Sequence, residues 1–95
     1  MILGKVKGTV VSSKKNINIE GARFLLIEKC KTNGEMIGDY LVALDLIGVG
    51  NDEMVMISQS TSARETPRTK DKPIDAVIVG IIDVIDEYDK EVYRK

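Results

Sequence analysis

The stretch that decides the fold is residues 45–55, which read Asp45-Leu46-Ile47-Gly48-Val49-Gly50-Asn51-Asp52-Glu53-Met54-Val55. It ends one apolar run, forms a glycine-rich loop and begins a second apolar run. A sharp connection between strands needs residues that tolerate positive φ, and Gly48 and Gly50 supply them. The Asp45 carboxylate can accept hydrogen bonds from N–H groups of the loop, as in an Asx turn. We therefore expect a strand, a glycine turn and a second strand.

Ligand-binding interpretations of this loop have little support. A phosphate-binding loop needs a following helix and a Lys-Ser/Thr pair, and the sequence has neither here. Asp45, Asp52 and Glu53 lie close together, but their spacing does not match a calcium loop. We expect a structural turn, with no cofactor and no metal site.

Five apolar segments predict strands: residues 2–13, 22–30, 39–45, 53–58 and 75–85. Gly4 and Gly8 fall on the apolar side of the first segment, which is typical of a strand that coils around a barrel. Asn33-Gly34 is a hairpin signal between the second and third segments. Five short strands in one small domain favour a mainly β fold, a five-stranded OB-like β-barrel.

Two segments interrupt the strand pattern. Residues 60–72 carry no large apolar side chain, which predicts an exposed loop with a short helical turn near residues 62–65. Residues 86–95 form a variable tail, in which the spacing of Ile85, Tyr88 and Val92 permits a short helix. The whole chain, residues 1–95, is expected to be a single domain.

Composition excludes several classes of function. The chain has no histidine, and its single cysteine, Cys30, permits no intrachain disulfide, which fits a reducing, cytoplasmic setting. No apolar run approaches about 18 residues, so we expect no membrane span. With a net charge of −1 and only four aromatic residues, the chain lacks the usual features of a nucleic-acid partner. We expect no enzyme activity; a single-stranded nucleic-acid-binding OB-type module is the alternative.

The strands carry more apolar surface than one barrel can bury. Residues 24–27, 40–44 and 76–82 are apolar on both faces, and one small interior cannot absorb both. The surplus predicts self-association into a cyclic oligomer, whose ring order the sequence does not determine. The residues expected at the subunit interface are Leu25, Ile27, Val77 and Val79.

Four motifs in order carry a family resemblance over residues 1–84. They are the opening Gly4-Lys5-Val6-Lys7-Gly8, Gly21-Ala22-Arg23-Phe24, the stretch 45–55, and Ser60-Thr61-Ser62-Ala63-Arg64 followed by residues 73–83. Together they resemble the pentameric vertex proteins of bacterial microcompartment shells, of the ethanolamine-utilisation and carboxysome type.

The resemblance implies a structural protein: a homopentamer that caps the five-fold vertices of a shell in the cytoplasm, beside hexameric shell proteins. It implies that the loop Gly48, Val49 and Gly50 approaches the five-fold axis. It further implies that exposed cations contact the hexamers, and the candidates are Lys14, Lys15, Arg64 and Arg68. Ethanolamine, choline, propanediol and carbon-fixation compartments all remain open.

Overall fold

The computed structural model describes residues 1–11, 23–59 and 76–95. These residues form seven strands and no helix: β1 (Ile2–Val10), β2 (Arg23–Cys30), β3 (Met36–Asp45), β4 (Met54–Gln59), β5 (Ala76–Ile81), β6 (Val84–Glu87) and β7 (Lys90–Arg94). The expected helical turn near residues 62–65 lies outside the described residues. No helix in the described part of the chain is long and apolar enough to cross a membrane.

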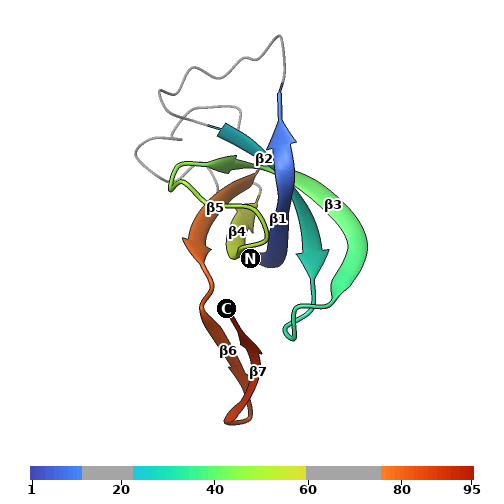
Figure 1. Cartoon of the computed structure of the whole chain (residues 1–95), viewed down its shortest axis with the longest axis vertical. Coiled ribbons are helices and arrows are strands. Elements are labelled where there is room, and N and C mark those ends of the chain that lie inside the picture. The colour runs from blue at the N-terminus through green and yellow to red at the C-terminus, as the bar shows by residue number, and fades with distance from the viewer. Residues whose placement is uncertain (12–22, 60–75) are drawn as a thin grey trace.

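The first five strands close into a barrel in the order β1-β2-β3-β5-β4, with β4 pairing back to β1. All the pairings are antiparallel except that of β3 with β5, which is parallel and registers at Leu44 and Val77. Figure 1 shows the strongly curved strands wrapping around one interior. The expected five-stranded barrel is confirmed.

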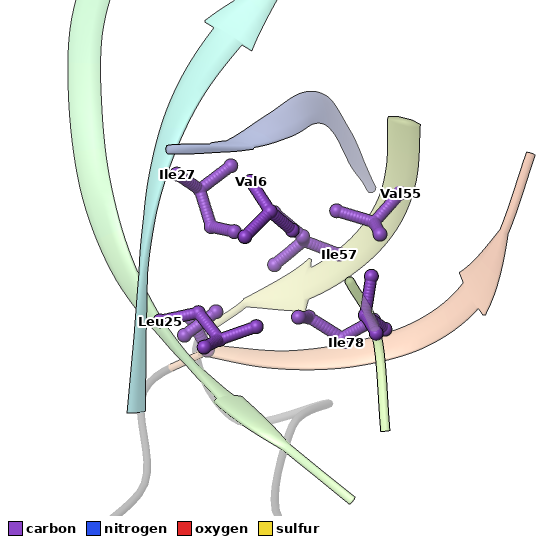
Figure 2. Packing of buried hydrophobic residues seen from close by; sticks show 9 residues of the cluster. Val6, Leu25, Ile27, Val55, Ile57 and Ile78 are labelled. Carbon is purple, nitrogen blue, oxygen red and sulfur yellow. The ribbon is translucent and has the colours of Figure 1, made fainter. Parts of the chain in front are cut away.

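Alternating residues of these strands fill the barrel with aliphatic side chains. The buried cluster draws on all five barrel strands, and Figure 2 shows its side chains packed together inside the barrel. The labelled members of this cluster are Val6, Leu25, Ile27, Val55, Ile57 and Ile78. All six are almost fully inaccessible to solvent. Because burial of each such side chain contributes about 1.5–3 kcal/mol, this cluster is the main source of the fold's stability.

Close packing of β1 on β2 explains one glycine in the opening strand. A Cβ atom on Gly4 would lie 2.4 Å from Cγ2 of Ile27 and 3.0 Å from the carbonyl oxygen of Glu28. No side chain fits there without displacing β2. The sequence pattern placed this glycine on the apolar side of β1, and the structure confirms that Gly4 is buried.

The turn between β2 and β3 follows its sequence signal. Gly34 donates its N–H to the carbonyl of Lys31, and its φ is 91°. The side-chain oxygen of Asn33 accepts the N–H of Glu35 at 3.0 Å, which forms an Asx turn. The predicted hairpin at Asn33-Gly34 is therefore confirmed.

The tail forms a β-hairpin and not the short helix that its apolar spacing permits. β6 and β7 make a separate two-stranded sheet, which extends away from the barrel in Figure 1. Tyr88 and Asp89 form the turn with φ values of 51° and 65°. Positive φ at both central residues is the geometry of a type I′ hairpin turn, which usually carries Asn-Gly. The sequence lacked that signal.

The hairpin is fastened to the barrel at several points. The ring of Tyr93 lies against Gly34, and the ammonium group of Lys5 is 5.7 Å from its centroid. Lys95 donates to the Glu53 carboxylate at 2.5 Å. A two-stranded hairpin is marginally stable alone, so these contacts make it part of the domain.

Candidate assembly interface

The loop after β3 is held by one buried carboxylate. Oδ1 of Asp45 accepts the N–H groups of Ile47 at 2.9 Å and Gly48 at 3.0 Å, and Oδ2 accepts that of Val49 at 2.9 Å. Arg23 on the neighbouring strand β2 donates to Oδ2 at 2.7 Å. The Asx-type role expected of Asp45 is confirmed, and the structure adds Arg23 as its ionic partner.

A second carboxylate holds the other half of the loop. Oε1 of Glu53 accepts the N–H of Gly50 at 2.7 Å, while Oε2 receives the Lys95 ammonium group. The N–H of Asp52 donates to the carbonyl of Val6 on β1 at 2.9 Å. The loop is therefore fixed at both ends and tied to the hairpin through Glu53.

These contacts shift the acidity of both carboxyls. Burial acts to raise the pKa of Asp45, but the three backbone N–H groups and Arg23 outweigh burial and hold that pKa below its ordinary value. Lys95 and the Gly50 N–H likewise lower the pKa of Glu53. Both groups are anionic at neutral pH, as their hydrogen bonds require.

The loop residues do not all have the surroundings expected of an axis-lining segment. The Val49 side chain is buried in the barrel core, so it is not available to line an axis. Gly48 and Gly50 are exposed. Gly48 has a φ of 88°, which explains that glycine, whereas Asp52 and not Gly50 adopts the second left-handed conformation.

Some of the expected interface residues are buried in the barrel and one is exposed. Leu25, Ile27 and Val77 are buried inside the single chain, so the expectation that they contact another subunit was wrong. Val79 is 41% exposed and remains available. It lies where the β4–β5 register shifts, because Gly80 pairs with Met56 and Ile78 with Ile57. The two expected residues of β2 therefore lie on the inner face of that strand.

The outer face of β2 and its neighbours is apolar. Leu26 points away from the core between Gly8 of β1 and Val42 of β3, which are its register partners. Val42 is 46% exposed and Leu26 is half-buried. We call this surface the β2 face; its members are Gly8, Val10, Phe24, Leu26, Tyr40 and Val42.

A buried acid supports one edge of the β2 face. Glu28 accepts the N–H of Gly38 at 3.0 Å, where the β2–β3 register shifts and φ of Gly38 is 81°. The negative charge of Glu28, together with burial and a hydrogen bond, raises the pKa of Tyr40. The Tyr40 phenol is therefore neutral at physiological pH and adds no charge beside Glu28.

A second apolar surface lies on the outer side of β4. Met56 registers with Leu3 of β1 and Gly80 of β5, and all three are half-buried. Val79 adjoins them. We call this surface the β4 face; its members are Leu3, Met56, Val79 and Gly80. The members of both faces are uncharged, and the register pair Lys5 and Glu28 lies at their border.

The cations expected to contact shell hexamers cannot be placed. Lys14, Lys15, Arg64 and Arg68 all lie outside the described residues.

The model of the Ethanolamine utilisation protein EutN/carboxysome family matches residues 1–83, which is most of the chain. The chain belongs to this family. A carboxysome shell vertex protein, CcmL of Gloeobacter violaceus, is 39% identical over 95 residues, covering 100% of this chain and 95% of that protein.

Solved structures of EutN/carboxysome family members have the same fold. The CcmL structure from Gloeobacter violaceus superposes with a TM-score of 0.92 and covers 100% of this chain and 98% of that one. The GrpN pentameric microcompartment shell protein of Rhodospirillum rubrum is 38% identical, with a TM-score of 0.81 and coverage of 92% and 99%. The shell vertex protein EutN of Salmonella typhimurium is 30% identical over 95 residues, covering 100% of this chain and 96% of that one.

Proposed function

We propose that the chain is a structural protein whose pentamers cap the five-fold vertices of a bacterial microcompartment shell. The observation that carries this proposal is family membership over residues 1–83, together with a pentameric shell relative that has the same fold. The role is mechanical, and it places the chain in the shell, inside the cytoplasm.

Geometry explains why a shell needs such a protein. Hexagonal tiles alone form a flat sheet, so a closed polyhedron requires five-fold positions at its corners. A protein at such a corner must form a ring, and a ring of five requires a head-to-tail contact between two different faces of the subunit. The barrel offers two uncharged apolar faces, which fits this requirement.

The rigid loop is the segment that we place near the five-fold axis. Gly48 and Gly50 are exposed, and the carboxylates of Asp45 and Glu53 hold their backbone. Val49 is excluded from this role because its side chain fills the barrel. Hexameric shell proteins are the proposed outer partners, with Lys14, Lys15, Arg64 and Arg68 retained as contact candidates on sequence alone.

The nucleic-acid alternative makes a different physical demand. A single-strand-binding barrel needs a cationic groove with stacking aromatics. The net charge of −1 and the shell-related names of the relatives favour the structural role. Salt-dependent retention of a labelled single strand at micromolar protein would instead support the nucleic-acid role.

Co-production with a hexamer-forming shell protein tests the vertex role. Electron microscopy should show closed polyhedral particles when the chain is present, and open sheets or tubes when it is omitted. Open assemblies in both cases, with none of the chain bound to them, would contradict the proposal.

A further inference from the structure

Gly8 lies directly after the register shift in β1, and neither crowding nor positive φ within its own chain requires a glycine there. Gly4 is required by crowding against Ile27, and three others adopt positive φ, namely Gly34, Gly38 and Gly48. Gly8 is not among the glycines with positive φ, and a Cβ atom built on it meets no heavy atom within 4 Å. Any small side chain would fit there in the isolated subunit.

A glycine inside a strand weakens that strand and often marks the close approach of another backbone. Gly8 occupies a central position on the β2 face, directly beside Leu26 and in the same register row as Val42. Val10 and Phe24 form the next row of the same face. The missing side chain therefore leaves a notch in an apolar surface.

The β4 face is positioned to supply the other half of a contact. In the closed order β1-β2-β3-β5-β4, β1 separates β2 from β4 on one side, and β3 and β5 separate them on the other. The two faces meet at β1 but are centred on different strands and consist of different residues, as a head-to-tail ring requires. Val79, at the register shift in β5, stands out from the β4 face with 41% of its surface exposed.

We infer that the β2 face of one copy packs against the β4 face of the next copy, with the backbones closest at Gly8. The occupant of the β2 face is thus a second copy of this chain. This inference rests on the proposed function, since it specifies which surfaces join the ring. The members of both faces are apolar except for the uncharged Tyr40, which suits them to burial against each other, with Lys5 and Glu28 at the border. The exposed Val42 and Val79 lie inside the contact.

A matched pair of substitutions tests the β2 face. Val42→Asp places a charge in the proposed contact, and Val84→Asp places the same charge on the hairpin, at a valine of similar exposure (46% and 42%). Native mass spectrometry at 10 micromolar chain should show loss of the ring for Val42→Asp and an intact ring for Val84→Asp. Circular dichroism should show both variants folded.

Mixing two variants tests the head-to-tail geometry. Val42→Asp disables the β2 face but keeps the β4 face, whereas Val79→Asp does the reverse. Each variant alone should be a monomer. A mixture should form a heterodimer and nothing larger, because the two chains together retain one compatible pair of faces.

The outcomes separate this inference from the function on which it rests. A wild-type chain that is monomeric would contradict the vertex role itself. A pentameric wild type whose Val42→Asp variant is folded and still pentameric would overturn only the assignment of faces. If the mixture stays monomeric although each variant is folded, the pairing of the β2 face with the β4 face is wrong.

Discussion

Arg23 and Asp45 form an ion pair across β2 and β3, with 2.7 Å between Nη2 and Oδ2, and Asp45 is completely buried. Arg23 also donates to the carbonyl of Val49 at 2.8 Å. The pair therefore joins the end of β3 to the loop that follows it. It fixes the loop that we place near the five-fold axis.

Replacing Asp45 should loosen this loop and destabilise the barrel. Asp45→Ala removes the acceptor of three backbone N–H groups and the ionic partner of Arg23, which should cost about 2–4 kcal/mol in the free energy of unfolding. Urea unfolding at a fixed chain concentration measures the loss. The control is Asp39→Ala, whose exposed ion pair with Lys29 should contribute less than about 1 kcal/mol. Equal losses in the two variants would contradict the clamp.

Stability should fall at acidic pH, partly through Asp45. An unfolded aspartate titrates near about 3.9, and the pKa of Asp45 in the folded chain is lower. Its contribution is therefore complete above the unfolded pKa and is lost as pH falls through the folded pKa. The lowered pKa of Glu53 acts in the same direction.

The measurement is urea unfolding from pH 7 down to pH 2.5 for the wild type and for Asp45→Asn. The variant should lose less stability than the wild type over the acidic part of this range, because position 45 no longer titrates. Parallel pH profiles would show that Asp45 is not held ionised by its surroundings.

The hairpin should contribute to stability through one tyrosine and not the other. Tyr93 is half-buried against Gly34 and Lys5, whereas Tyr88 is fully exposed at the turn. Tyr93→Ala should lower the free energy of unfolding by about 1–3 kcal/mol, which is less than the cost at a fully buried aromatic site. Tyr88→Ala should change it by less than about 0.5 kcal/mol. Thermal melts of the two variants provide the comparison, and a neutral Tyr93→Ala would mean that the hairpin does not pack on the barrel.

The two glycines of β1 should respond differently to alanine. Gly4→Ala forces a methyl group against Ile27 and should cost about 1–3 kcal/mol. Gly8→Ala has open space and should leave the fold of the dissociated chain within about 0.5 kcal/mol, while weakening the ring. Urea unfolding of each glycine variant in the Val42→Asp background measures the effect on the fold. Dilution of rings that carry Gly8→Ala alone measures the effect on assembly. Unchanged ring affinity for Gly8→Ala would count against close approach at that position.

The barrel could be predicted from sequence because its signals are local. Apolar strands, the Asn33-Gly34 turn and the Asp45 cap each depend on residues near one another in the chain. The face of β2 that turns inward could not be predicted, because Phe24 to Ile27 are all apolar. Without alternating polar residues, the sequence does not show which of these side chains point into the barrel. Inward Leu25 and Ile27 and outward Leu26 follow only from the register with β1 and β3.

The structure of the tail, residues 86–95, could not be predicted for a different reason. Ile85, Tyr88 and Val92 have helical spacing, but Tyr88 lies in the turn of the hairpin, so the three side chains do not form one helical face. The Tyr88-Asp89 turn lacks the usual glycine, and the contacts that stabilise the hairpin come from Lys5, Gly34 and Glu53, far away in sequence. No local pattern contains that information.

The mass of the purified, untagged chain in native solution tests the central claim most directly. We expect one dominant species at five times the chain mass of 10.5 kDa, at 10 micromolar chain and physiological salt, without any ligand. A folded chain that remains monomeric under these conditions, or closes into rings of another order, would contradict a protein built to occupy five-fold corners.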